Sequence, residues 1–342
     1  MTNWSCLLLI CGACGTAPST SGDDVMSPPD APAGDRSPLE RCLQDGGSLH
    51  ELWSVANQHG PVTSIVAGSL VVVGGEDGSV KQWSVEGDEP AYGTPFTTAG
   101  APVGAVALST DGNVLAATRQ GEVAEWRLAD AMPARTTTIT DAELSALAVS
   151  GDGAVAIAGT ATGQLIAIDR ASGTTSQLTS TLWGAWSVAF AAGNRLYTAG
   201  HFYGTPQIER RAADAPADAV DVWNDHARNA HVRAIAIDGE ATRLVAAGDG
   251  FVATFAADEL AAGPRALGEL AEHQAVGVVL LTGGTLFVTA GSEGTLRVWN
   301  AETAALLATL SIAAPSGIAA DTAGTRLYTS GPDGLLHAFG CD

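Results

Sequence analysis

Seven histidines and five cysteines are the side chains of this 342-residue chain that are best suited to metal or nucleophilic chemistry. The histidines are scattered through the sequence: His50, His59, His201, His226, His231, His273 and His337. A metal site needs several histidine or carboxylate ligands that converge. Asp225, His226 and His231 lie close together, but a solvated loop is the simpler interpretation. We therefore expect no metal site.

The sequence signatures of common enzymes are also missing. There is no G-x-S-x-G, no H-E-x-x-H, no P-loop and no G-x-G-x-x-G. Lys81 is the single lysine, and the net charge of −21 repels nucleic acid and anionic lipid. We expect no catalytic residue, no cofactor and no binding of nucleic acid.

Three of the cysteines lie in the first fourteen residues. The apolar run 7–10 and the small residues before Cys14 match the hydrophobic part of a signal peptide. Residues 1–14 resemble a bacterial lipoprotein signal, which implies that Cys14 becomes the lipidated first residue. An ordinary secretory signal or a misassigned start is the alternative. Residues 15–46, which are largely Pro, Ser, Gly, Asp and Ala, predict a flexible tether.

Repeated β-strands must position any site in the rest of the chain. One series of turn glycines recurs at spacings of 40 to 46 residues: Gly78, Gly121, Gly163, Gly204, Gly250, Gly294 and Gly334. A second series precedes each of these by 9 to 11 residues, and short segments rich in Val, Ala, Leu and Thr lie between them. Strand, turn, strand, turn, strand is the unit that this pattern predicts. Seven such units predict an all-β, seven-bladed β-propeller over residues 47–342.

Two of these units resemble the WD-repeat β-propeller family. The sequence TAGSEGTLRVWN at 289–300 is the closest, and GGEDGSVKQW at 74–83 is similar. The family links a histidine, a turn carboxylate, a hydroxyl and a tryptophan by hydrogen bonds. The resemblance implies structural sets of His59, Asp77, Ser79 and Trp83, and of His273, Thr295 and Trp299 with Glu293 in place of the aspartate.

The two ends of the repeat region are expected to close the ring together. Residues 50–55 precede the first unit and have no blade of their own, whereas the seventh unit supplies only three strands. Pairing the N-terminal strand as the outer strand of the last blade removes two exposed edges. Cys42 and Cys341 flank this junction, and in an oxidising compartment we expect a disulfide between them. Two unpaired thiols are the alternative.

Five aromatic rings are the strongest candidates for binding a partner. Trp183 and Trp186 enter the fourth unit, and His201, Phe202 and Tyr203 lie in its second turn. The family resemblance implies that these two loops open onto one face, and Trp and Tyr are favoured binding anchors. The alternative is that Trp186 and Phe202 pack between neighbouring sheets.

These observations favour a non-enzymatic interaction scaffold for an unidentified protein partner. We expect a monomer on the extracytoplasmic side of a bacterial membrane, held by its lipid anchor only. No Asp follows Cys14, which favours the outer membrane; a secreted or periplasmic soluble protein is the alternative. A propeller hydrolase or lyase acting on an extracytoplasmic sugar or lactone remains open, as does a small-ligand sensor.

Overall fold

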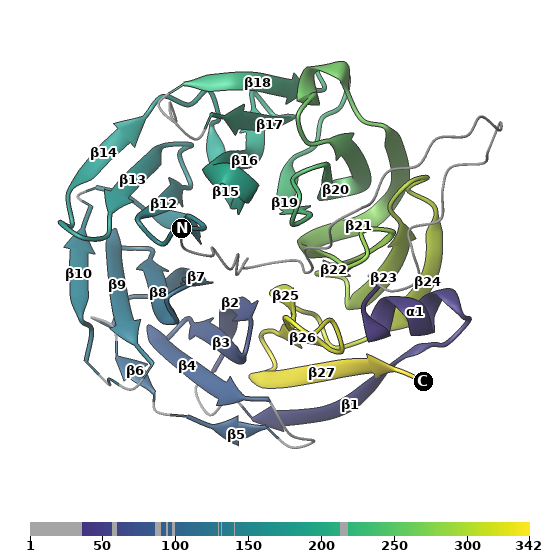
Figure 1. The fold of residues 1–342 in the computed structure, drawn as a ribbon, viewed down its shortest axis with the longest axis horizontal. Coiled ribbons are helices and arrows are strands. Elements are labelled where there is room, and N and C mark those ends of the chain that lie inside the picture. The colour runs from purple at the N-terminus through teal and green to yellow at the C-terminus, as the bar shows by residue number, and fades with distance from the viewer. Residues whose placement is uncertain are drawn as a thin grey trace, which may run out of the picture.

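Antiparallel sheets succeed one another around a central axis, with one short helix beside the ring (Figure 1). The computed structural model describes residues 36–56, 60–85, 90–93, 95–97, 100–128, 130, 132–139, 141–212 and 218–342. Cys14, the proposed signal segment, most of the proposed tether and His59 lie outside the described residues. Within the described residues, no helix is long and apolar enough to cross a membrane.

The first three sheets follow one another along the chain. The first contains β2 (Val62–Ala67), β3 (Leu70–Gly75), β4 (Ser79–Ser84), β5 (Ala91–Tyr92) and β6 (Phe96–Thr97). The second contains β7 (Val103–Leu108), β8 (Asn113–Thr118), β9 (Glu122–Arg127) and β10 (Arg135–Thr138). The third contains β11 (Leu144–Val149), β12 (Val155–Thr160), β13 (Leu165–Asp169) and β14 (Thr175–Leu178).

The remaining sheets complete the ring. The fourth contains β15 (Gly184–Ala191), β16 (Arg195–Phe202), β17 (Thr205–Arg211) and β18 (Ala219–Asn224). The fifth contains β19 (Val232–Ile237), β20 (Arg243–Ala256), β21 (Ala266–Leu280), β22 (Leu286–Gly291), β23 (Thr295–Asn300) and β24 (Leu306–Ser311). The sixth contains β25 (Gly317–Ala320), β26 (Leu327–Ser330), β27 (Leu335–Cys341) and β1 (Leu49–Ala56). Two 3₁₀ turns, η1 (Ala192–Asn194) and η2 (Leu260–Ala262), and the helix α1 (Pro38–Gln44) are the other elements.

The β-propeller expectation is confirmed, but the expected seven blades are wrong, because the described residues form six sheets. The difference lies in β21, which runs unbroken for fifteen residues. Its first part pairs with β20 and its second part, from Ala275 to Leu280, pairs with β22. Residues 266–280 contain no Pro, Asn, Asp or Ser, which together with Gly dominate turns. The fifth and sixth sequence units therefore share one strand and one sheet.

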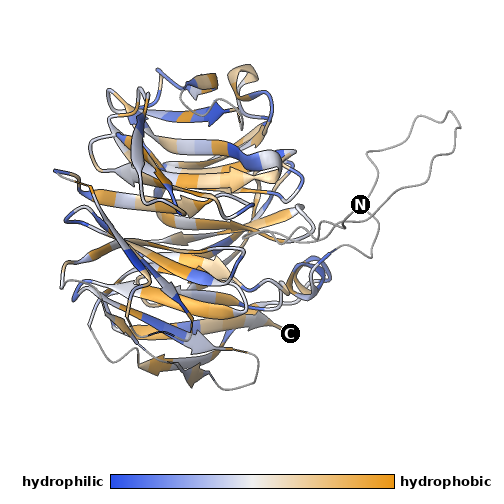
Figure 2. Cartoon of the chain, turned by 60° about the vertical axis from the view of Figure 1, so that its left-hand side comes forward, coloured by the Kyte–Doolittle hydropathy of each residue, from blue (hydrophilic) through white to orange (hydrophobic). Residues whose placement is uncertain are grey.

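Apolar side chains fill the spaces between neighbouring sheets. Strands such as β3, LVVVGG, are buried on both faces because each sheet lies between two others. Figure 2 shows apolar residues running along the strands. Five of the innermost strands share an irregularity near their first residue, where the register with the next strand shifts: β2, β7, β11, β15 and β19. β21 has the same irregularity in its second part, between Ala275 and Gly277. The residues at these β-bulges include Trp186 and Arg233, on adjacent strands β15 and β19.

The N-terminal strand closes the ring as expected. β1 pairs antiparallel with β27, from Leu49 opposite Cys341 to Ala56 opposite Leu335. The Cys42–Cys341 disulfide, also predicted, joins residues 299 apart in sequence with a Cα–Cα distance of 6.0 Å.

The helix α1 differs from the expectation that residues up to 46 form a tether. Ser37 caps its N-terminus, with its hydroxyl accepting a hydrogen bond from the backbone N–H of Glu40 (3.2 Å), and Pro38 stands at the start of the helix. The buried carboxylate of Glu40 accepts hydrogen bonds from the backbone N–H groups of Thr285 (2.9 Å) and Leu286 (3.1 Å). These bonds fasten α1 to the turn between β21 and β22.

Candidate partner-binding site

Three of the five predicted rings form one exposed group, which we call the aromatic platform: Trp183, Phe202 and Tyr203. Trp183 precedes β15, and the other two lie at the turn between β16 and β17. Trp183 is 49% exposed and Tyr203 is 65% exposed, and their ring centroids are 3.8 Å apart. Phe202 is half-buried beside them, 4.5 Å from Tyr203 and 6.3 Å from Trp183 between ring centroids. The structure therefore brings these predicted residues together at the surface.

Tyr203 has a backbone conformation that is unusual for a bulky residue. It and Gly204 form the two-residue turn between β16 and β17, with φ values of +50° and +80°. Positive φ at both central positions defines a type I′ turn, which Asn and Gly favour. A tyrosine held there costs on the order of 1 kcal/mol or more. Strained backbone of this kind clusters at functional sites, which makes Tyr203 a candidate functional residue.

Trp186 and His201 belong to a second, half-buried group beside the platform. Their rings stack with centroids 4.9 Å apart. His231, from the segment before β19, contacts both, with ring centroids 4.8 Å from Trp186 and 4.6 Å from His201. The Arg233 guanidinium lies 4.2 Å from the centre of the Trp186 ring, a cation–π arrangement between two adjacent β-bulges. The alternative prediction, that Trp186 packs between neighbouring sheets, fits its half-buried position.

The electrostatics of this second group centre on Asp249. Its carboxylate accepts a hydrogen bond from Arg233 Nε (2.9 Å) and lies 2.8 Å from His231 Nδ1. Burial, together with the neighbouring His231 and Arg233, lowers the pKa of His201 below its ordinary value. Nδ1 of the neutral His201 accepts from the backbone N–H of Gly204 (3.3 Å). Arg233, paired with Asp249, therefore lies against the aromatic rings of this group.

A buried ion pair holds the segment that carries Trp183. Glu209 and Arg211 are fully buried, with 2.6 Å between Oε2 and Nη2. Glu209 Oε1 accepts from both the backbone N–H (3.0 Å) and the hydroxyl (2.7 Å) of Thr181, and Arg211 donates to the Thr179 carbonyl. Charge-assisted hydrogen bonds in a buried setting are the strong ones. The backbone entering Trp183 is therefore held by hydrogen bonds to a buried carboxylate.

Arg211 occupies the position on the third strand at which several other sheets have a large aromatic side chain. It pairs across the strands with Leu196, as Trp83 pairs with Val71 and Trp126 with Val114. Trp299 and Phe339 hold the same place, opposite Phe287 and Leu327. The fourth sheet thus replaces an interior ring with a buried cation, which the sequence pattern alone did not single out.

The second predicted structural set forms a hydrogen-bonded chain in the fifth sheet. The Trp299 indole N–H donates to Thr289 Oγ1 (2.9 Å), which lies 2.9 Å from His273 Nε2. His273 Nδ1 lies 2.7 Å from Glu293 Oε1, and the Thr295 hydroxyl donates to the same oxygen (2.7 Å). Burial raises the pKa of Glu293, but the hydrogen bonds from His273 and Thr295 outweigh it and lower that pKa to about 2. Thr289, which the sequence did not single out, joins the histidine to the tryptophan.

The first set is present in part. Asp77 Oδ1 accepts from the backbone N–H (3.0 Å) and the hydroxyl (2.6 Å) of Ser79, and Trp83 is buried nearby in β4. His59 lies outside the described residues. Across the part of the chain that the structure describes, no group of three or more His, Cys, Asp or Glu residues could hold a metal ion.

Comparison with known proteins identifies the class of fold. Residues 50–84 and 265–300 match the WD40 family, described as WD domain, G-beta repeat. These stretches contain most of the two hydrogen-bonded sets. Together with the ring of sheets, the matches support membership of the WD-repeat β-propeller family. No curated protein matches the sequence significantly.

Proposed function

We propose that this chain is a non-enzymatic protein-interaction scaffold that binds a protein partner through the aromatic platform. The observation that carries the proposal is the pair of exposed rings, Trp183 and Tyr203, on a backbone fixed by buried hydrogen bonds. Trp and Tyr supply most of the energy at many interfaces. A surface that is already ordered loses little entropy on binding. The WD-repeat fold agrees with a scaffold role.

The half-buried group beside the platform supports recognition rather than catalysis. Both Arg233 and His231 contact Asp249, and Nδ1 of His201 is occupied by a backbone N–H. Arg233 with its aromatic neighbour is typical of interface anchors.

The location that we propose is the extracytoplasmic side of a bacterial membrane, with Cys14 as the lipidated residue. The Cys42–Cys341 disulfide supports an oxidising compartment. Metabolic labelling with a fatty-acid analogue should mark the wild-type chain and not Cys14→Ser. Equal labelling of both would contradict the anchor.

Two substitutions test the platform, and they differ in their expected effect on stability. Trp183→Ala should reduce capture of a partner from membrane extract at least tenfold with little change in the melting temperature. Tyr203→Gly should reduce capture similarly while leaving the melting temperature equal or higher, because glycine relieves the positive φ.

Tyr92→Ala is the matched control, since Tyr92 is an exposed tyrosine on the first sheet. It should capture the same partner as the wild type. The proposal fails if all three variants capture equally, or if Trp183→Ala unfolds the domain.

A further inference from the structure

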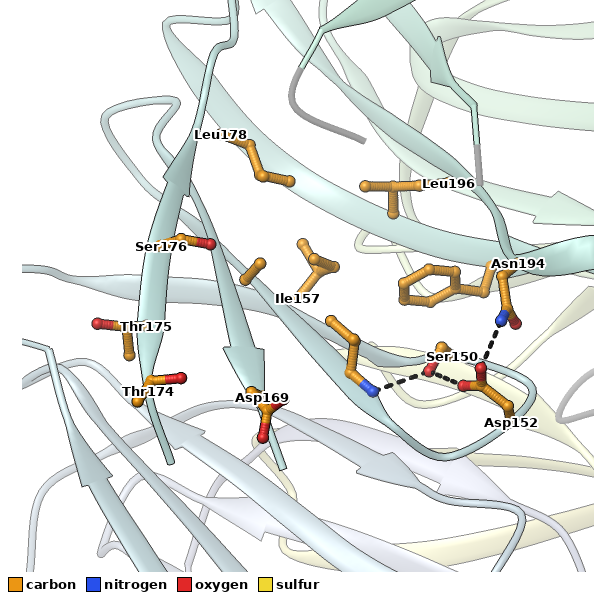
Figure 3. A pocket seen from close by; sticks show the side chains of 13 residues that line it. Ser150, Asp152, Ile157, Asp169, Thr174, Thr175, Ser176, Leu178, Asn194 and Leu196 are labelled. Atoms are coloured by element: carbon orange, nitrogen blue, oxygen red, sulfur yellow. Dashed lines mark hydrogen bonds between the residues drawn. The ribbon is translucent and has the colours of Figure 1, made fainter. Parts of the chain in front are cut away.

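A cavity of about 380 Å³ opens between the third and fourth sheets, at the end of β16 remote from the aromatic platform (Figure 3). Asn194 marks this end of β16 and Tyr203 follows its other end. Thirteen side chains from both sheets and their turns line it. They are Ser150, Asp152, Val155, Ile157, Ala167, Asp169, Thr174, Thr175, Ser176, Leu178, Phe190, Asn194 and Leu196.

The boundary between these sheets lacks the fully buried ring that the third strand supplies elsewhere, and Phe190 at this boundary is only half-buried. At other boundaries, Trp83 and Trp126 pack against the preceding sheet. The corresponding residue of the fourth sheet is Arg211, and its guanidinium turns to Glu209 and to the Thr179 carbonyl. The buried apolar residues that remain here are mostly of modest size, such as Ile157 and Leu196. The boundary is therefore packed less densely than protein interiors usually are.

The walls of the cavity have two chemical characters. Ile157, Leu178 and Leu196 give it an apolar floor. The rim carries hydroxyls and two carboxylates, Asp152 and Asp169, and none of the thirteen lining residues is a lysine or arginine. The rim is therefore negative without a compensating cation among the residues that line it.

Hydrogen bonds hold both carboxylates ionised and in place. Asp152 accepts from the Ser150 hydroxyl (2.6 Å) and from Asn194 Nδ2 (2.7 Å), and Figure 3 shows both bonds. Asp169 Oδ1 accepts from the backbone N–H of Ser172 (2.7 Å). These bonds keep the pKa of each aspartate below its ordinary value.

We propose that this cavity binds a small organic cation, namely a protonated amine or quaternary ammonium on a compact apolar body. The volume lies within the range of small-molecule sites. The floor removes the apolar body from water, and the rim complements the positive charge. An anion would meet two carboxylates, and a polyol would leave the apolar floor unfilled. This site is separate from the aromatic platform and does not depend on the proposed function.

A matched series of probes tests the charge preference in the full mature chain. Phenethylammonium, 2-phenylethanol and phenylacetate share an aromatic body and differ in charge. Saturation-transfer NMR titrations should give a dissociation constant for phenethylammonium at least threefold lower than for the alcohol, with no binding of phenylacetate. Equal affinity for the ammonium and the alcohol, or tighter binding of the acid, would overturn the proposal.

Two variants locate the binding in this cavity. Ala167→Leu fills the space and should weaken phenethylammonium binding at least tenfold. Asp169→Asn should weaken it about two- to fivefold, as expected for an exposed charge, without affecting 2-phenylethanol. Asparagine is compatible with this turn, because Asn300 caps the corresponding turn after β23 by accepting from the N–H groups of Glu302 and Thr303 (both 2.9 Å).

Glu302→Gln is the control for a lost charge outside the cavity, and it should bind phenethylammonium like the wild type. Melting temperatures of all variants establish that each is folded. Wild-type affinity in folded Ala167→Leu would show that the probe binds elsewhere and would overturn the assignment.

Discussion

Thr289 shows how one hydroxyl can satisfy two buried groups. It accepts from the Trp299 indole and contacts His273 Nε2, and all three side chains are almost completely buried. An unpaired polar group in such a place costs about 1–3 kcal/mol. The chain also contains a natural contrast. Thr198 occupies the same place in the fourth sheet: it lies opposite Val188, as Thr289 lies opposite Val278. The Thr198 hydroxyl has no hydrogen-bond partner among the described residues.

Replacing each threonine by valine should therefore give opposite results. Thr289→Val leaves the indole N–H and the imidazole without their partner, and it should lower the free energy of unfolding by about 2 kcal/mol or more. Thr198→Val removes a hydroxyl that is already unpaired and should change stability little or raise it. Urea denaturation of both variants is the measurement. Equal destabilisation would mean that lost packing, not the hydrogen-bonded chain, decides the effect.

The sequence predicted individual residues well where chemistry stays within one repeat. Trp299 and His273 were implied by the resemblance to the WD-repeat family, and the five rings were noticed because their loops belong to one unit. Arg233 joins the site from the next unit. A contact between residues of neighbouring sheets leaves no pattern in the local sequence. Arg211 was missed for a different reason. Counting five residues from a turn glycine reaches Trp126 from Gly121 but only Glu209 from Gly204, because the hairpin of β16 and β17 is longer than that of β8 and β9.

At the scale of elements, His337 joins the two strands that close the ring. Its Nδ1 lies 2.9 Å from Glu51 on β1, and its Nε2 lies 2.8 Å from Asp333 before β27. Burial lowers the pKa of His337, but the two carboxylates outweigh it and the net shift is upward. The imidazolium therefore supports the pairing of β1 with β27.

The stabilising effect of His337 should depend on pH. Since the folded-state pKa lies above the unfolded value of about 6.5, the contribution is complete below that pH and is lost as pH rises through the folded pKa. His337→Gln should therefore reduce the free energy of unfolding more at pH 5.5 than at pH 9, as measured by urea denaturation against the wild type. A difference that is the same at both values would show that His337 is neutral in the fold.

Element boundaries were less predictable than element types. The turn glycines mark the turns within a repeat, so the strands themselves were foreseen. Breaks between repeats carry no such mark. β21 continues through one of them because residues 266–280 contain no Pro, Asn, Asp or Ser and find partners on both sides, β20 and then β22. The helix α1 was likewise hidden in a polar segment, although Ser37 and Pro38 are good helix-start residues.

For the whole molecule, the disulfide is the main covalent constraint on the unfolded chain. A bond that encloses nearly 300 residues contributes roughly 5 kcal/mol in the chain-entropy model. Cys42→Ser with Cys341→Ser should lower the melting temperature by roughly 10 °C or more. The wild type in reductant should melt at the same lower temperature, and the double variant should be insensitive to reductant. An unchanged melting temperature in the double variant would show that the strand pairing alone closes the ring.

The pairing of β1 with β27 also sets the order in which the molecule can be completed. Residues 49–56 leave the ribosome early, yet their partner strand ends at Cys341. Until that late segment is available, β1 has no partner and the sixth sheet lacks its outer strand. Contacts between such distant segments form slowly, because a very long loop must close first. We therefore expect ring closure to be a late step in folding, because a chain that ends before residue 335 lacks the strand that pairs with β1.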